Sequence, residues 1–168
     1  MGKDTQDKNI LSREFSSGGI VYKKTDKGLL WLVRRTSASK MFPNTYWMFP
    51  KGWLDDAGPD IPGPMARGSV KATEEILQKT AIRETREETG VEAKIIKKIG
   101  TINLFYTHPI RGKVMKFVTH YLMEWIKDDP NGFDFETSEI AWLPYNEALE
   151  RLSYKSEKEA LEKAKNLL

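Results

Sequence analysis

The sequence predicts an α+β fold built around a mixed β-sheet, on the basis of three observations. Segments rich in β-branched and aromatic residues, which are typical of strands, recur along most of the chain. One internal stretch, residues 72–89, has the composition of a long helix. The strand-like and helix-like segments follow one another without a regular βαβ alternation, which favours a mixed sheet over a regular series of βαβ units.

The first expected strands lie close to the N-terminus. Residues 15–24 and 29–33 are expected to form a hairpin, because Asp26-Lys27-Gly28 between them is typical of a turn. A short apolar strand near residues 47–49 is stopped by Pro50 and leads into Gly52, where the backbone can approach a ligand closely. Further strands are expected at 91–99, 101–106, 114–125 and 140–143, and further helices at 146–152 and 156–168.

The helix at residues 72–89 has recognisable signals at both ends. Thr73 can cap its N-terminus, and Glu74 and Glu75 occupy the first turn, where the helix dipole favours acidic side chains. Gly90 is a natural terminator, because glycine readily adopts the left-handed conformation that ends helices. These signals predict a helix that ends just after an acidic run.

Length and composition limit the function classes. The chain has 168 residues, enough for one domain with its own core, and it contains no cysteine, so a disulfide framework or a thiolate metal site is excluded. It has no apolar run near the roughly 20 residues of a membrane span and no signal-like N-terminus, so a cytoplasmic protein without membrane association is expected. The net charge of +3 is too small to indicate an obligate nucleic-acid partner. Both a monomer and a homodimer remain open.

The domain boundaries follow from local composition. Residues 1–13 are polar and are expected to form a flexible N-terminus, and residues 14–168 a single domain. Within that domain, residues 53–74 are rich in glycine and proline, which argues against a regular element there. A loop of this length is usually functional or mobile.

The acidic run in the predicted helix suggests a metal site. Glu87 and Glu88 lie three and four residues after Glu84, so the three carboxylates share about 100° of the helix surface. Their mutual repulsion must be offset, in part by neighbouring Arg83 and more effectively by a divalent cation. An all-oxygen cluster suits Mg²⁺, or Mn²⁺, better than zinc. The alternative is a solvated helix face with local ion pairs.

The run resembles the second half of the Nudix box. Six positions match the pattern of that family: Arg83, Glu84, Glu87, Glu88, Gly90 and Val91. Thr85 stands where an aliphatic residue is usual, and Glu75 matches the upstream glutamate of the box. The opening glycine would fall at Ser69, but Gly52, in Phe49-Pro50-Lys51-Gly52, is the better match. On this alignment the box contains an insertion of 17 residues.

The resemblance implies a fold, an activity and a set of site residues. It implies an α/β/α sandwich around a mixed sheet and Mg²⁺-dependent hydrolysis of a nucleoside diphosphate linked to a further group. Glu84, Glu87, Glu88 and the carbonyl of Gly52 would hold the metal, and Arg83 would orient the glutamates. Glu75, about 180° round the helix from Glu84, is expected to organise the loop rather than to bind metal.

A further carboxylate is expected from a later loop of the Nudix domain. Two glutamates that precede Ile140-Ala141-Trp142 are candidates for this catalytic role, Glu136 and Glu139, and Glu136 is preferred. The alternative for both is a solvated loop residue.

Within the family, the chain is most similar to the diadenosine tetraphosphate hydrolase branch. The similarity rests on Pro50-Lys51-Gly52, on the strand Lys113–Trp125 and on the C-terminal run from Trp142. It implies a dinucleoside polyphosphate as substrate. Oxidised nucleoside triphosphates, nucleotide sugars including ADP-ribose, the 5′ end of RNA, and a non-catalytic nucleotide-binding module remain alternatives.

Such a substrate needs basic groups for its phosphates and aromatic groups for its bases. The basic candidates are Lys51, Lys113, Lys116 and Arg34, and the aromatic candidates are Tyr106, Tyr154 and Phe105. The alternatives are an exposed surface charge for each basic residue and core packing for each aromatic one. His108 and His120 are isolated in sequence and are expected to have surface or packing roles, and most of the tryptophans are expected to build the core.

Overall fold

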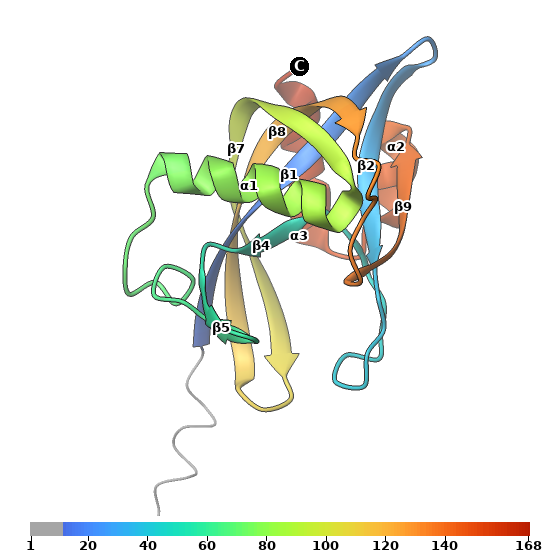
Figure 1. Cartoon of the computed structure of the whole chain (residues 1–168). Coiled ribbons are helices and arrows are strands. Elements are labelled where there is room, and N and C mark those ends of the chain that lie inside the picture. Colours follow the sequence, from blue (N-terminus) through green and yellow to red (C-terminus); the bar gives the residue numbers. More distant parts are fainter. Residues whose placement is uncertain (1–11) are drawn as a thin grey trace, which may run out of the picture.

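A computed structural model describes residues 12–168 and contains one large mixed sheet (Figure 1). Its strands run in the order β3-β2-β1-β8-β7, with β4 also paired to β1 and β9 to β2. The pair β1–β8 is parallel and the other pairs are antiparallel, so the sheet is mixed as predicted. The strands are β1 (Ser12–Thr25), β2 (Gly28–Thr36), β3 (Trp47–Met48), β4 (Lys51–Trp53), β7 (Val91–His108), β8 (Gly112–Asp128) and β9 (Thr137–Leu143).

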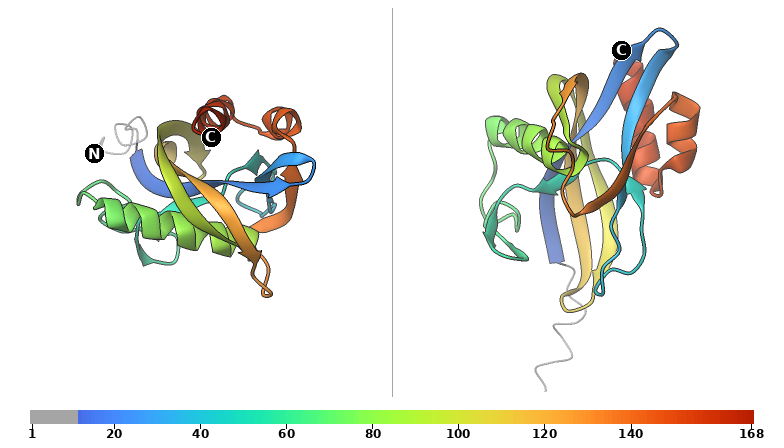
Figure 2. Two further views of the ribbon diagram at one scale, coloured as in Figure 1. Left: turned by 90° about the horizontal axis from the view of Figure 1, so that it is seen from above. Right: turned by 45° about the vertical axis from the view of Figure 1, so that its right-hand side comes forward.

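Helices cover both faces of this sheet. The long helix α1 (Glu74–Thr89) lies on one face, and α2 (Tyr145–Arg151) and α3 (Lys155–Asn166) lie on the other (Figure 2). This arrangement confirms the predicted α+β class and the α/β/α layering. No helix within residues 12–168 is long and apolar enough to cross a membrane.

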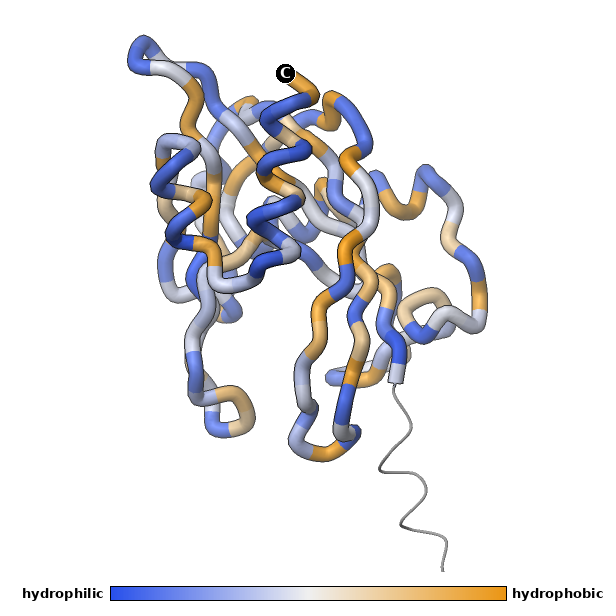
Figure 3. Tube along the Cα trace, turned by 180° about the vertical axis from the view of Figure 1, so that it is seen from behind, coloured by the Kyte–Doolittle hydropathy of each residue, from blue (hydrophilic) through white to orange (hydrophobic). Residues whose placement is uncertain are grey.

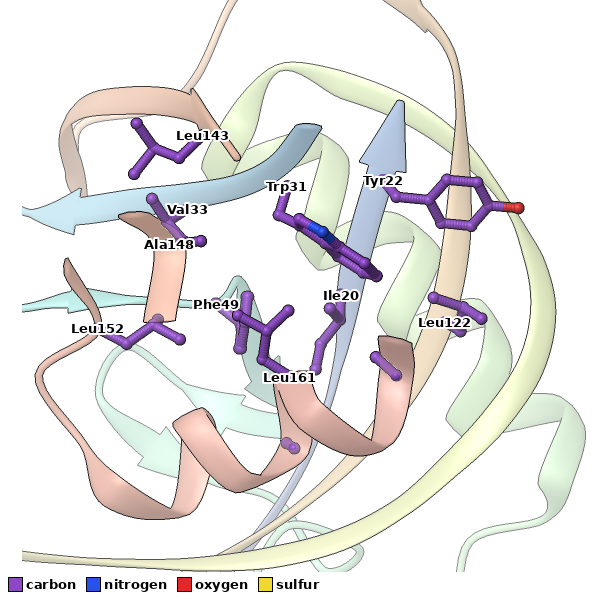
Figure 4. Close-up of a cluster of buried hydrophobic side chains, with 12 residues drawn as sticks. Ile20, Tyr22, Trp31, Val33, Phe49, Leu122, Leu143, Ala148, Leu152 and Leu161 are labelled. Atoms are coloured by element: carbon purple, nitrogen blue, oxygen red, sulfur yellow. The ribbon is translucent and has the colours of Figure 1, made fainter. Parts of the chain in front are cut away.

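Each face of the sheet has its own apolar core. The larger core lies under α2 and α3, where Trp31 and Phe49 from the sheet side meet Leu161 of α3 (Figure 4). The smaller core lies under α1 and includes Ala81, Tyr121 and Met123. Hydrophobic and hydrophilic residues alternate along α3, as expected of a helix that buries one side only (Figure 3). The tryptophans contribute as predicted: Trp31 is 1% exposed, and Trp47, Trp125 and Trp142 pack at the core margins.

Two glycines in β1 allow other elements to lie directly on this strand. A side chain at Gly18 would collide with the carbonyl of Pro50, just before β4. A Cβ at Gly19 would lie 2.6 Å from Oγ1 of Thr85 on α1. Thr85 is fully buried against the sheet, so the residue that replaces the usual aliphatic side chain of the box still faces the core. The Gly18-Gly19 pair therefore sets how closely β4 and α1 approach β1.

Several sequence-based boundaries require correction. The segments 91–99 and 101–106 form one strand, β7, because a register irregularity at Gly100 lets the chain continue. Residues 12 and 13 belong to β1, while the rest of the predicted flexible terminus, residues 1–11, lies outside the described residues.

The Gly/Pro-rich insertion is more ordered than the sequence predicts. It contains a small hairpin of β5 (Asp56–Gly58) and β6 (Ile61–Pro62), so the expectation that it lacks regular elements is wrong. The Asp55 carboxylate accepts hydrogen bonds from the backbone N–H groups of Met65 (3.0 Å) and Ala66 (2.8 Å). The carbonyl of Ala66 in turn accepts the N–H of Phe15 in β1 at 2.7 Å. The Asp55 side chain thus holds the two ends of this part of the insertion together.

Candidate active site

Helix α1 carries the acidic run and is fixed at both ends as predicted. The Thr73 side chain accepts a hydrogen bond from the N–H of Ile76 at 3.3 Å, and Gly90 ends the helix with φ of 69°. Thr85 faces the sheet, and Glu84 and Glu88, one turn apart on the same side of the helix, face the β4 segment Lys51-Gly52.

Gly52 and Glu84 bring the two halves of the box together. A side chain at Gly52 would occupy the position of the Glu84 carboxyl group. Gly52 is held there because β4 pairs with β1 through Ser17. Only glycine lets the helix approach this strand so closely, so the contact supports the alignment of Gly52, rather than Ser69, with the start of the box.

Arg83 joins two of the three glutamates. Its Nη1 lies 2.8 Å from Oε1 of Glu84 and 3.1 Å from Oε2 of Glu87. Burial raises the pKa of Glu84, Arg83 lowers it, and the nearby charges of Glu87 and Glu136 raise it again. The carboxylates therefore lie in a region where one guanidinium does not fully offset their charge.

Glu88 is held differently from the other two. It is 4% exposed, and its Oε1 accepts the backbone N–H of Lys51 at 2.7 Å. Its Oε2 lies 3.4 Å from Nη2 of Arg34. Burial raises the pKa of Glu88, and Arg34 and Lys51 lower it. Glu88 therefore fixes the backbone of the Pro50-Lys51-Gly52 segment against α1.

Arg34 lies beneath the site rather than on its surface. It is 3% exposed, and its Nε donates to Oγ1 of Thr137 and its Nη2 to the carbonyl of Glu136, both at 2.8 Å. These contacts, together with Glu88, occupy its guanidinium. Arg34 was predicted from the sequence to bind phosphate, whereas in the structure it joins β2 to α1 and to the start of β9 with the loop before it.

The donor set of the site fits a magnesium or manganese ion. Glu84 and Glu87 share one arginine nitrogen, so their carboxylates are close enough to reach a common ion. The Gly52 carbonyl belongs to the segment packed on Glu84, and all of these donors are oxygen atoms. Among residues 12–168, no three acidic or histidine side chains already converge into a closed metal cage. A cation would therefore have to compete with Arg83 for Glu84 and Glu87.

The two candidate glutamates before Ile140, Glu136 and Glu139, have different surroundings. The Glu136 charge contributes to the raised pKa of Glu84, and its carbonyl accepts hydrogen bonds from Arg34 and from the N–H of Ser37 (2.9 Å). Glu139 instead forms an exposed ion pair with Arg35 at 3.1 Å.

Glu75 lies on the exposed side of α1. It pairs with Lys79 one turn along the same helix, at 2.9 Å. The loop-organising role expected of Glu75 falls to Asp55, which is the acidic side chain that holds the insertion.

Sequence reasoning missed a buried carboxylate beside two of the predicted substrate residues. Glu14 is fully buried and accepts hydrogen bonds from Tyr106 Oη (2.9 Å) and Trp53 Nε1 (3.0 Å). It also forms ion pairs with Arg111 (2.7 Å) and Lys116 (3.6 Å). Burial raises the pKa of Glu14, but the four partners together lower it by more, so the net shift of the pKa is downward. Lys116 and Tyr106 are thus oriented by Glu14.

The other predicted substrate residues are spread over the same end of the molecule. Lys51 is close enough to Lys116 for the charge of Lys116 to lower its pKa. Lys113 is exposed next to the β7–β8 turn, and Phe105 is 61% exposed. Tyr154 is half-buried just before α3.

The loop of residues 37–46 supplies two aromatic residues that the sequence did not single out. Phe42 packs against Tyr106 with ring centroids 6.4 Å apart, and Tyr46 packs against Tyr154 at 5.6 Å. The loop runs beside the tip of the β7–β8 hairpin (Figure 1 and Figure 2, right), where the rings of Phe42 and His108 lie 5.8 Å apart. One loop therefore contributes to two aromatic pairs, one through Phe42 in its middle and one through Tyr46 at its end.

His120 has the packing role expected of it. It is fully buried beside Phe49, and neither ring nitrogen has a hydrogen-bond partner among residues 12–168. Burial lowers the pKa of His120 to about 3. His108 caps the β7–β8 turn, where its Nδ1 accepts the N–H groups of Ile110 and Arg111 at 3.1 Å.

Known proteins resemble the chain in both sequence and fold. The family model described as NUDIX domain matches residues 13–164. A relative named "Putative mutator protein MutT4", from Mycobacterium tuberculosis (strain CDC 1551 / Oshkosh), is 36% identical over 94 residues. These residues make up 56% of this chain and 38% of that protein, so the chain matches well under half of the relative's length.

Solved structures with low sequence identity share the fold. A Caenorhabditis elegans Ap4A hydrolase in a binary complex superposes with a TM-score of 0.62 at 19% identity, over 92% of this chain and 96% of that one. The MutT protein from Methanosarcina mazei Go1 gives 0.61 at 20% identity, over 94% and 96%. The NUDIX domain of Shewanella oneidensis NrtR, complexed with ADP ribose, gives 0.61 at 16%, over 99% and 94%.

The match over residues 13–164, together with Glu84 packed on Gly52, defines the class of protein: the chain belongs to the Nudix family.

The buried position of Arg34 leads to a stability prediction. Replacing Arg34 with methionine leaves Glu88 buried without its main counter-charge, so we expect a loss of about 3–5 kcal/mol in the free energy of unfolding. Urea denaturation at neutral pH measures this loss. The double variant Arg34→Met/Glu88→Gln should recover most of the stability, because it removes the uncompensated charge.

The neighbouring arginine provides the control. Arg35→Met removes only exposed interactions, an ion pair with Glu139 and a hydrogen bond from Nε to Oγ1 of Thr45 (3.1 Å), and should cost about 1 kcal/mol or less. An Arg34 variant that is no less stable than the Arg35 variant would contradict the structural role assigned to Arg34.

Proposed function

We propose that the protein is a Mg²⁺-dependent pyrophosphohydrolase that cleaves nucleoside diphosphates linked to a further group, with a dinucleoside polyphosphate such as diadenosine tetraphosphate as its preferred substrate. The observation that carries the hydrolytic part is the packing of Glu84 on Gly52, with Arg83 joining Glu84 to Glu87. Mn²⁺ has the same preference for oxygen donors and is expected to replace Mg²⁺.

Each residue of the site has its own role in the proposed hydrolysis. Glu84, Glu87, Glu88 and the carbonyl of Gly52 would hold the ion, which when bound neutralises phosphate charge and lowers the pKa of a coordinated water. Arg83 keeps the carboxylates of Glu84 and Glu87 together. Glu136, whose charge acts on Glu84, is suited to accept a proton from the attacking water.

Support for a polyphosphate with two bases comes from the surroundings of the acidic run. Lys51, Lys116 and Arg111 provide positive charge at one end of the sheet. The pairs Phe42–Tyr106 and Tyr46–Tyr154 offer two separate aromatic surfaces, one for each base. Lys116 Nζ lies 5.5 Å from the Tyr106 ring centroid, which links the basic group to one of these surfaces.

A nucleoside triphosphate is the second candidate substrate. It is favoured by the 36% identity with the mycobacterial relative named as a mutator protein. A triphosphate would use one aromatic pair and leave the other unoccupied.

If the protein is a metal-dependent hydrolase, exchanging one carboxylate oxygen of Glu87 for an amide nitrogen should lower kcat strongly. Glu87→Gln keeps the size of the side chain but removes a charged ligand, so kcat should fall by more than about 100-fold, since changes one shell further from a metal already cost 10- to 100-fold. Phosphate-release assays with a nucleotide panel and Mg²⁺ measure this. Glu150→Gln, an exposed position on α2, is the matched control and should retain parental activity. Equal activity of the Glu87→Gln variant and the parent would contradict the proposed mechanism.

Product analysis tests the substrate. Asymmetric cleavage of diadenosine tetraphosphate should yield ATP and AMP, which chromatography separates. The value of kcat/KM for this substrate should exceed the values for nucleoside triphosphates. A triphosphate that is hydrolysed far better than the dinucleotide would replace the preferred substrate with the second candidate.

A further inference from the structure

The segment Phe49–Gly52 is held from both faces of the sheet. On the side of α1, the N–H of Lys51 donates to Glu88 and the backbone of Gly52 packs on Glu84. In the middle, the carbonyl of Pro50 accepts the N–H of Gly19 at 3.2 Å. On the opposite side, the N–H of Phe49 donates to Oε2 of Glu157 at 2.9 Å.

Glu157 is an unusual residue at its position in α3. It is fully buried on the helix face that also carries Ala160, Leu161 and Ala164, which pack in the larger core. Its Oε1 has no hydrogen-bond partner among residues 12–168. A buried, incompletely paired carboxylate costs free energy, and an apolar side chain would pack there at no such cost. Packing therefore does not explain a glutamate at this position.

The charged surroundings of Glu157 connect it to the active site. The positive groups that act on it are those of Lys51 and Arg34, which also act on Glu88. Lys51 is influenced in turn by Glu157, Lys116, Glu88 and Arg34. The Lys51 Nζ itself lies 3.1 Å from Sδ of Met48, and among residues 12–168 it forms no ion pair with Glu88 or Glu157, so these two carboxylates act on it only through their charge.

The backbone of the segment leaves few ways to fix its position. Pro50 has no N–H, so within residues 49–51 the backbone donors are those of Phe49 and of Lys51, the first residue of β4. Each of the two donates to a glutamate, one to Glu157 and the other to Glu88. Loss of either acceptor would free one end of the segment that carries Gly52.

We propose that Glu157 is a positioning residue of the hydrolytic site, through which the C-terminal helix α3 fixes the backbone of Phe49–Gly52, and with it the Gly52 carbonyl, against Glu84 and Glu88 of α1. The inference rests on the proposed function for its catalytic consequence. The structural part of the proposal is that α3 supports the segment that carries Gly52. This part follows from the hydrogen bonds of the Phe49 and Lys51 N–H groups.

Substitutions at Glu157 separate the hydrogen bond from the charge. Glu157→Leu removes the acceptor and keeps the volume. Glu157→Gln keeps an oxygen that can accept the N–H of Phe49 but removes the charge. Glu157→Asp keeps the charge and withdraws the acceptor by one methylene group. Glu159→Gln, two residues along α3 and exposed, is the matched control.

Mn²⁺ binding to the nucleotide-free protein, followed by electron paramagnetic resonance, provides a readout independent of turnover. We expect Glu157→Leu to weaken Mn²⁺ binding roughly 10- to 100-fold, as supporting residues around metal sites commonly do. Glu157→Gln should stay within a few-fold of the parent, Glu157→Asp should be weaker than Glu157→Gln, and Glu159→Gln should match the parent. In steady-state assays with diadenosine tetraphosphate, kcat should fall in the same order.

Several outcomes would overturn the proposal. One is a Glu157→Leu protein with a lowered melting temperature but parental Mn²⁺ affinity and kcat, which would mean that Glu157 serves stability alone. If the leucine variant does not fold, the other two decide: an aspartate variant that binds Mn²⁺ better than the glutamine variant contradicts positioning through the hydrogen bond. Absence of turnover by the parent would overturn the proposed function but not the Mn²⁺ comparison.

Discussion

The contact between Glu84 and the backbone of Gly52 is the interaction on which the rest of the site depends. It joins a helix and a strand that are separated in sequence by the whole Gly/Pro-rich insertion. The contact is possible only because β1 has glycines at positions 18 and 19, where β4 and α1 lie directly on it. Three glycines in two strands therefore determine where the Glu84 carboxylate meets the backbone of Gly52.

Buried charges surround this contact on both faces of the sheet. Glu88 and Glu157 hold two N–H groups of one short segment, Arg34 supports Glu88, and Glu14 orients Lys116. Buried ion pairs contribute little net stability compared with apolar packing, so their value lies in fixing geometry. Their distribution suits a site in which metal ligands and basic groups must keep fixed relative positions before a highly charged substrate arrives.

The sequence alone predicted those parts of the fold and site whose causes are local. The limits of α1 followed from Thr73 and Gly90, and the hairpin of β1 and β2 followed from its turn. The grouping of Glu84, Glu87 and Glu88 with Arg83 needed only the geometry of one helix. The pairing of Gly52 with this helix was predicted only from the resemblance to the Nudix box. The spacing of residues alone does not predict it, because the insertion separates Gly52 from the helix.

The remaining features depend on long-range pairing that a single sequence does not reveal. Glu14 meets Lys116 because β1 runs parallel to β8, and no local pattern indicates that neighbour. Arg34 seemed to be a free cation at a strand end, but β9 and α1 enclose it. The order within the insertion depends on Asp55 reaching backbone groups about ten residues away, which a count of glycines and prolines does not anticipate.

A single substitution, Gly52→Ala, tests the central claim most directly. The added methyl group would occupy the place of the Glu84 carboxylate, so we predict parental secondary structure by circular dichroism with a loss of hydrolysis of about 100-fold or more. Metal-dependent hydrolysis at the parental rate by a folded Gly52→Ala protein would contradict the account, because the approach of Glu84 to this backbone would then be unnecessary.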